Sequence, residues 1–276
     1  MSFAIKGFGI NLKPSFFVMC AVFIIYGMGR ELCILIFSVT MHEAAHIVTA
    51  YACGLAPKGV TITPIGQQAD IRGMENISLI RRIFIVSAGP GVNLVLWLMF
   101  DSNMNLALFL LNVLPVYPLD GGRLLHYILG YCLGVLRANR VQSFLSKGIA
   151  VAIFALGFVQ TIMYCYNISL LCIGLYLIKI NKKEYINMTF AFYRSVMYRN
   201  DKKVLSVRSL AAGEGICLKA LVYRLGWDYY TVVYLRDKNG RCEKSINEEE
   251  LISYILNKNI NHCLKDVFTE REKKLN

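Results

Sequence analysis

The sequence lacks the cysteine spacing of small folds that are stabilised by disulfides or by a structural zinc ion. Its nine cysteines include no pair separated by two residues and form no regular framework, which argues against a structural zinc site or a disulfide scaffold. We expect reduced thiols, most of them buried as small apolar side chains. A dense basic tract is also absent, because the Lys and Arg residues behind the net charge of +12 are spread along the chain. Direct binding of nucleic acid is therefore not expected.

A cleavable secretion signal is not expected either. Lys6 and Lys13 precede an apolar run from Ser15 to Met28, which superficially resembles such a signal. No cleavage site of the A-x-A type follows, and a second long apolar run begins at Leu32. We expect the first run to be a retained membrane span.

Long apolar segments dominate the first two thirds of the chain. The hydrophobic content of 56% and the mean hydropathy of +0.47 exceed those of ordinary soluble proteins. The apolar stretches cover about 14–29, 32–53, 82–100, 104–134, 147–164 and 165–179. The predicted fold is therefore a polytopic α-helical membrane protein with about six transmembrane helices. Prolines 115 and 118 and glycines 121 and 122 predict that the helix over 104–134 breaks near its middle.

The loop charges predict the orientation. With six spans both termini share one side of the membrane, and twelve Lys and Arg residues of the loops and flanking segments fall on that side, against only Arg30 on the other. Since positive loops favour the cytosol, we expect a multi-pass protein with both termini cytosolic. The twelve are Lys6, Lys13, Lys58, Arg72, Arg81, Arg82, Arg137, Arg140, Lys147, Lys179, Lys182 and Lys183.

The composition predicts three parts. Residues 1–180 form the membrane domain, 181–203 a linker or amphipathic helix, and 204–276 a small α+β module on the cytosolic side. Within that module we expect a strand from Val204, a helix over 218–225, a strand over 231–235, a turn at 237–240 and a helix over 247–256. Within the membrane domain, residues 59–71 predict either a short hairpin or an irregular loop.

The sequence His42-Glu43-Ala44-Ala45-His46 carries the chemistry. On a helix the two histidines lie one turn apart on one face, where both imidazoles can bind one zinc ion, and Glu43 can act as general base on the metal-bound water. An accidental match is the alternative. It is disfavoured because the chain has only four histidines and three ionisable residues in an apolar span are costly.

A third ligand is needed for a catalytic zinc site, and Asp120 is the candidate. It is an acid in an otherwise apolar stretch, placed where the prolines and glycines let the backbone turn. Taken alone, this segment could equally be an interfacial turn. In the same stretch, Asn112 can bind the substrate backbone or the developing oxyanion, or make an interhelical hydrogen bond. Asn93 is expected at a close helix contact, and His126 and His262 are expected to be structural or surface residues.

These motifs together resemble the site-2 protease family of intramembrane zinc metalloproteases. The matching features are the paired histidines, the segment Ala88-Gly89-Pro90-Gly91-Val92-Asn93, and Asn112, Pro115, Pro118 and Asp120 with their spacing. The order of spans and tail is most similar to the sporulation branch of that family, whose tail is a cystathionine-β-synthase (CBS) domain. The segment Pro64-Ile65-Gly66-Gln67 departs from the Pro-Phe-Gly-Gly usual there.

The resemblance implies a zinc endopeptidase that cleaves a membrane-associated protein. It further implies a membrane-tethered pro-sigma factor as the substrate, membrane-embedded inhibitory regulators, a homo-oligomer, and a location in the mother-cell membrane around the forespore. A CBS-like tail is compatible with ATP, although Glu248 stands where the nucleotide motif has Asp. Two alternatives from other classes are a membrane metal transporter and a catalytically inactive membrane scaffold. The transporter is disfavoured because inverted repeats and further buried acids are absent.

Overall fold

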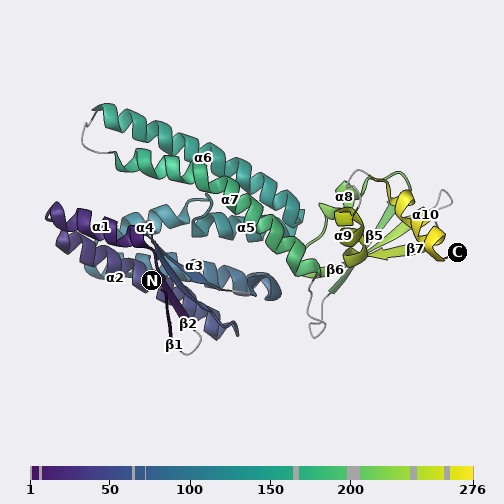
Figure 1. Ribbon diagram of the computed structural model, residues 1–276, viewed down its shortest axis with the longest axis horizontal. Helices are drawn as coiled ribbons and strands as arrows, with labels where there is room; N and C mark the ends of the chain where they lie inside the picture. Colours follow the sequence, from purple (N-terminus) through teal and green to yellow (C-terminus); the bar gives the residue numbers. More distant parts are fainter. Residues whose placement is uncertain are drawn as a thin grey trace. The chain divides into compact units, whose positions relative to one another are not determined.

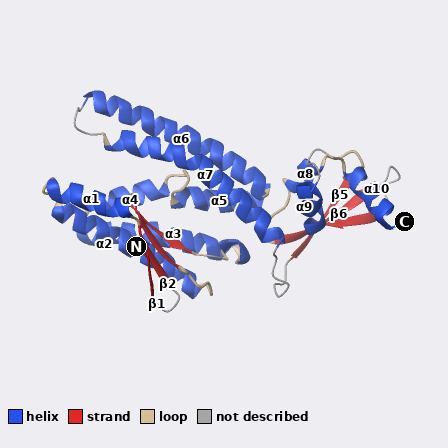
Figure 2. Cartoon of the chain, viewed as in Figure 1, coloured by secondary structure: helices blue, strands red, loops and turns tan. Residues whose placement is uncertain are grey.

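The computed structural model describes residues 2–5, 8–63, 66–71, 73–163, 168–197, 206–236, 241–257 and 262–275. These residues are mostly helical, with two small sheets (Figures 1 and 2). The chain divides into two compact units, Met1–Leu124 and Leu125–Asn276, and each is described by itself. The domain boundaries expected at 180 and 204 remain a prediction.

A four-stranded sheet lies in the first unit. Its strands, in spatial order, are β1 (Ser2–Ile5), β2 (Phe8–Leu12), β3 (Gly59–Thr63) and β4 (Gly66–Asp70). The central pair β2 and β3 is parallel, and the two outer pairs are antiparallel. The hairpin expected over 59–71 is confirmed by β3 and β4, while Pro64 and Ile65 lie outside the described residues. Strands β1 and β2 were not predicted.

The helices of the first unit follow the apolar segments. They are α1 (Pro14–Ile25), α2 (Gly29–Ala52), the 3₁₀ turn η1 (Met74–Asn76), α3 (Leu79–Phe100) and α4 (Asn103–Val113). Helix α3 packs against both α2 and α4. The fully buried Arg82 at the start of α3 donates hydrogen bonds to the carbonyl oxygens of Met74 and Ile77 at 2.8 and 2.7 Å. These bonds fix the loop that connects the sheet to α3.

Three described helices are long and apolar enough to cross a bilayer, namely α2, α3 and α6 (Val135–Met163). By length and composition, the described residues therefore contain three candidate membrane spans. The 12 residues of α1 and the 11 of α4 correspond to only about 18 and 17 Å at ~1.5 Å per residue, against a ~30 Å hydrocarbon core. The expected total of six spans remains a prediction. The break expected within 104–134 is confirmed, because α4 ends at Val113 and α5 (Asp120–Leu133) begins after six intervening residues.

In the second unit, α6 and α7 (Ser169–Met197) run side by side as a long helical hairpin (Figure 1). Glycines allow the close approach: a Cβ atom on Gly157 would lie 2.4 Å from the nitrogen of Leu171. Buried amides join the helices, and Asn181 donates to the carbonyl oxygen of Ser143 at 2.9 Å. Such bonds hold apolar helices together within a bilayer. Helix α7 continues to Met197, so 181–197 of the expected linker or amphipathic helix is helical, and 198–203 lie outside the described residues.

The C-terminal residues form a three-stranded sheet with short helices. The elements are β5 (Ser206–Gly213), α8 (Leu218–Val222), β6 (Tyr229–Arg236), β7 (Cys242–Asn247), α9 (Glu248–Asn257) and α10 (Leu264–Leu275). Strands β5 and β6 are parallel, and β7 is antiparallel to β6. The expected first strand, helix, second strand and helix over 247–256 are confirmed as β5, α8, β6 and α9. β7 and α10 were not anticipated, and the expected turn at 237–240 lies outside the described residues.

The tail sheet is docked on the helices of its own unit through Trp227. The Trp227 ring centroid lies 5.3 Å from that of His126, 5.6 Å from that of Tyr127 and 6.3 Å from that of Phe192. A backbone bond of 3.1 Å from Val135 to the oxygen of Leu225 adds to this contact. The expectation that His126 is structural is confirmed, since its side chain is fully buried in this aromatic cluster.

Candidate metal centre

Helix α2 presents both histidines of the motif toward the protein interior. His42 and His46 are one helical turn apart, and both side chains are buried. Their Nε2 atoms lie only 3.1 Å apart. Such a close approach of two ring nitrogens is favourable only when a proton or a cation lies between them.

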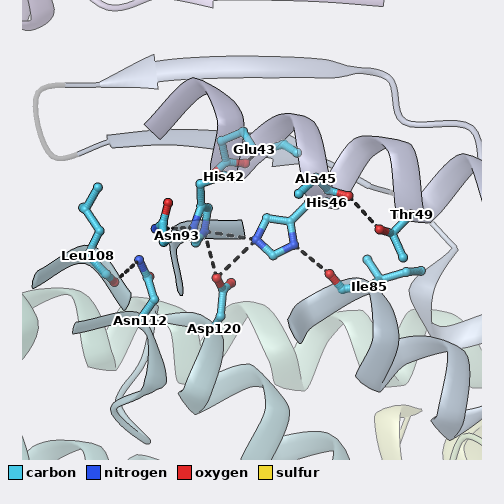
Figure 3. A network of polar contacts seen from close by, with 11 residues as sticks. His42, Glu43, Ala45, His46, Thr49, Ile85, Asn93, Leu108, Asn112 and Asp120 are labelled. Carbon is cyan, nitrogen blue, oxygen red and sulfur yellow. Dashed lines mark hydrogen bonds and ion pairs between the residues drawn. The ribbon is translucent and has the colours of Figure 1, made fainter. Parts of the chain in front are cut away.

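Asp120, the first residue of α5, completes the cluster (Figure 3). Its Oδ2 atom lies 3.0 Å from Nε2 of His42 and 3.2 Å from Nε2 of His46. The three residues form a buried group able to hold a metal ion. Ligands at ~2.0–2.1 Å around a tetrahedral zinc ion lie about 3.3 Å from one another. The donor types and their spacing therefore fit zinc, with the fourth position left for water or substrate.

Glycines let α5 begin at this point. A Cβ atom on Gly121 would lie 2.2 Å from the carbonyl oxygen of Val113, and one on Gly122 would lie 2.5 Å from the carbonyl carbon of Val116. No real side chain tolerates such distances. The Gly121-Gly122 pair thus lets the first turn of α5 pass directly against the segment after α4, which brings the Asp120 carboxylate to the histidines.

A backbone carbonyl fixes the tautomer of His46. The Nδ1 atom of His46 lies 2.7 Å from the oxygen of Ile85 on α3. A carbonyl oxygen can only accept, so Nδ1 carries the hydrogen and donates it. The lone pair is then on Nε2, the atom that faces Asp120. Contacts of this kind orient the histidine ligands of metal sites.

Asn93 holds His42 in the corresponding way. This fully buried side chain places its amide nitrogen 3.0 Å from Nδ1 of His42, while its Oδ1 atom is buried without a hydrogen-bond partner. Turning the amide over lets Oδ1 accept the Nδ1 hydrogen of His42. Only that orientation leaves Nε2 of His42 with a lone pair for a metal and also satisfies Oδ1. The expected close helix contact of Asn93 is thus, more specifically, a contact to a candidate ligand, which the sequence spacing did not show.

We expect Asn93→Leu to weaken zinc binding by roughly 10–100-fold, the usual cost of losing a residue that orients a metal ligand. Asn93→Asp retains an acceptor for the His42 hydrogen and should stay close to the native affinity. A chelator competition titration measures both. Native zinc affinity in the leucine variant would show that the contact does not orient His42.

The missing side chain of Gly89 on α3 leaves room for the imidazoles of both histidines. A Cβ atom at this position would lie 2.3 Å from Nε2 of His46 and 2.6 Å from Nε2 of His42. The backbone of α3 therefore passes directly beside the ligand atoms, and any side chain here would enter the space between them. Gly91, two residues further along the same helix, has no neighbour within 4 Å of its Cβ position.

Gly89→Ala is expected to displace the two imidazoles and to reduce zinc content strongly, whereas Gly91→Ala leaves it unchanged. Both substitutions add one methyl group to one helix, so the pair separates crowding of the site from a general effect on α3. Elemental analysis of the purified variants measures the difference. Equal zinc content in the two variants would contradict the geometry around Gly89.

The carboxylate of Glu43 is also buried and is anchored by the sheet. Its Oε2 atom accepts a hydrogen bond of 2.9 Å from the backbone nitrogen of Ala69 on β4. Strand β4 is the edge of its sheet, and this N–H points to Glu43 rather than to β3. The hairpin thereby positions the acid that follows the first histidine.

Asn112 lies on α4 in the same unit, and its amide nitrogen donates to the carbonyl oxygen of Leu108 at 3.0 Å (Figure 3). This bond stays within its own helix. The structure therefore brings His42, His46 and Asp120 into direct contact and places Asn112 in the segment just before Asp120. The roles expected of Asn112 toward a substrate remain a prediction.

These features define a class of protein. Two histidines of one apolar helix and an aspartate after a helix break form a buried metal-binding group, in a chain with three candidate membrane spans. A neighbouring glutamate is held in place by a backbone amide. These features indicate the class of membrane proteins with a candidate metal centre of the metallopeptidase type.

Comparison with known proteins finds a family model that matches part of the chain. The family model described as Peptidase family M50 matches residues 96–156. Stage IV sporulation protein FB of Bacillus subtilis (strain 168) is 26% identical over 151 residues, 48% of this chain and 52% of that protein. Zinc metalloprotease MJ0392 of Methanocaldococcus jannaschii is 27% identical over 200 residues, 63% of this chain and 57% of that protein. The chain thus spans little more than half the length of these curated relatives.

The solved structure of the site-2 protease from Methanocaldococcus jannaschii has a similar fold. It has a TM-score of 0.50 and 24% sequence identity, and the match covers 67% of this chain and 95% of that one. Residues 96–156 thus match a peptidase family M50 domain, the sequence relatives include a zinc metalloprotease, and the fold of the chain is similar to that of a solved site-2 protease. The resemblance noted from the sequence motifs is confirmed.

Proposed function

We propose that the protein is a zinc endopeptidase that hydrolyses a peptide bond of a membrane-associated protein at or within the bilayer. The observation that carries the proposal is the convergence of the His42, His46 and Asp120 ligand atoms in an M50-type domain. These three residues are the proposed zinc ligands. Glu43 is the proposed general base.

Zinc, when bound, supplies Lewis acidity that polarises a carbonyl group and lowers the pKa of water. Glu43 accepts the proton of the attacking water and returns it to the leaving amine, so that one carboxylate serves both steps. The Ala69 hydrogen bond holds one oxygen of that carboxylate, which leaves the other to exchange the proton. Asn112 uses one amide hydrogen for Leu108 and has a second to offer to the substrate carbonyl.

We propose that strand β4 binds the substrate. As an edge strand it can pair with an extended peptide, and its Ala69 amide reaches Glu43. A peptide added to this edge therefore lies next to the proposed base. A protease needs an extended substrate backbone, because a helix buries its peptide bonds in intrahelical hydrogen bonds.

A more specific proposal is that the protein acts in sporulation. The similarity to stage IV sporulation protein FB supports a membrane-tethered pro-sigma factor as the substrate and the mother-cell membrane around the forespore as the location. Membrane-embedded inhibitory regulators, a homo-oligomer, six spans and cytosolic termini belong to the same proposal. The tail is proposed to be CBS-like and to dock substrate. We place ATP binding by the tail below substrate docking. Glu248, which stands where the nucleotide motif has Asp, is fully buried and accepts a 2.9 Å hydrogen bond from the nitrogen of Thr231.

Co-expression with a sporulation pro-sigma factor tests the function. The native enzyme should generate the shortened product, and Glu43→Gln should not. Equal product with both proteins would assign cleavage to a host protease and favour the scaffold or transporter alternative. If the pro-sigma factor stays intact while another membrane-tethered protein is cleaved, the protease assignment stands and the sporulation substrate is wrong.

The proposed orientation predicts that a reporter fused after residue 276 is active only in the cytosol. The physical reason is the bias of Lys and Arg toward one set of loops. Paired cytosolic and extracytosolic reporters measure this directly. Activity of the extracytosolic reporter would refute both the orientation and the span map behind it.

A further inference from the structure

Two cysteines of the tail lie opposite each other. Cys217 immediately precedes α8, Cys263 immediately precedes α10, and the two form an isolated antiparallel β-bridge. Both are thiols and partly exposed. The expectation that most cysteines are buried was wrong, because each of the eight described cysteines is partly or well exposed.

The flanking hydrogen bonds determine what kind of pair this is. The nitrogen of Leu218 donates to the oxygen of His262, and the nitrogen of Leu264 donates to the oxygen of Ile216, both at 2.9 Å. These bonds lie on either side of the cysteines and do not join them. Cys217 and Cys263 are therefore a non-hydrogen-bonded antiparallel pair, in which Cα atoms are ~4.5 Å apart and side chains are closest.

This spacing permits a disulfide without movement of the backbone. Disulfides span Cα distances of about 4.4–6.8 Å, and the pair falls at the short end of that range. Its backbone is held on both sides, since Leu218 and Leu264 are fully buried. The carboxylate of Asp266 also accepts a bond of 2.9 Å from the nitrogen of Cys263.

We propose that Cys217 and Cys263 form a redox-active dithiol that closes to a cross-strand disulfide. With a small-molecule disulfide such as oxidised glutathione, one thiolate attacks its S–S bond and releases one glutathione. The second thiolate then attacks the bound cysteine sulfur and releases the other. Two protein thiols are oxidised, one glutathione disulfide is reduced to two thiols, and the two protons pass to the released glutathione.

The bond closes a loop that contains α8, β6, β7 and α9, and it ties the start of α8 to the start of α10. Because both ends are already paired in the reduced protein, oxidation preserves the fold and restrains the opening of the tail. Thiol–disulfide exchange runs in both directions, so an external thiol can open the bond again. Cys242 is an exposed thiol of the same tail whose register partner on β6 is Arg236, so it provides an internal control.

The test is to treat the purified full-length protein in detergent with oxidised glutathione and to map its cysteines by mass spectrometry without reduction. We expect a cross-linked peptide containing Cys217 and Cys263, two hydrogens lighter than the sum of its parts, while Cys242 carries a glutathione adduct. In Cys217→Ser the cross-link should be lost and Cys263 should carry the adduct. Cys242→Ser should retain the cross-link. Separate adducts on Cys217 and Cys263 in the native protein, or no reaction of either, would overturn the proposal.

Discussion

Replacing Glu43 by Gln is expected to abolish cleavage while leaving the zinc content at the native level. An amide cannot take a proton from water, and general-base catalysis contributes roughly 10²–10⁴-fold to a rate. The amide oxygen of Gln can still accept the hydrogen bond from Ala69, so the local structure is preserved. Single-turnover cleavage of the substrate, together with elemental analysis of the same sample, measures the two effects separately.

Glu31 provides the matched control. It lies on the same helix as Glu43 but is exposed in the first turn, so Glu31→Gln removes an equal charge without touching the site. Native activity is expected in that variant. Cleavage by Glu43→Gln at the rate of the Glu31 variant would remove Glu43 from the mechanism.

Asp120→Ala is expected to lose both zinc and activity. Its Oδ2 atom lies within 3.2 Å of both histidine nitrogens, so its removal takes away a proposed ligand and leaves two neutral imidazoles. The loss of zinc affinity should exceed the ~10–100-fold that follows loss of an orienting residue. Zinc retention during dialysis against a weak chelator measures it. Full zinc occupancy in this variant would place the third ligand elsewhere.

Asn112→Ala separates metal binding from substrate handling in the same segment. Its side chain bonds to Leu108 on its own helix, so the variant should retain zinc. Reduced cleavage with native zinc would support its proposed contact to the substrate carbonyl. Native cleavage would leave Asn112 with its intrahelical hydrogen bond alone.

Local patterns predicted those parts of the site that depend on one helix or one turn. The spacing of His42 and His46 corresponds to one helical turn, and the prolines and glycines before and after Asp120 predicted the interruption between α4 and α5. In contrast, the contacts of Asn93 and Gly89 depend on how α3 crosses α2. The bond from Ala69 to Glu43 depends on where the hairpin lies. Spacing along the chain carries no information about such crossings.

The same distinction applies to the rest of the fold. Strands β1 and β2 are short, and a pairing across almost fifty residues between β2 and β3 holds them in the sheet. Strand β7 is largely polar, and its Ile246 is buried. Strand β2 does alternate, with Phe8, Ile10 and Leu12 at every second position, but it is short and precedes a long apolar run. Strand β7 has no such alternation and is stabilised by pairing with β6.

The docking of Trp227 has a consequence for how the second unit opens. Detaching the tail would expose the indole together with the ring of Phe192, which is fully buried, and would break the backbone bond from Val135 to Leu225. Amides around α8 and β6 should therefore exchange with solvent in the same event as those at the adjoining end of α6. Hydrogen exchange would report one cooperative unit across a boundary that composition alone places between a membrane part and a soluble part.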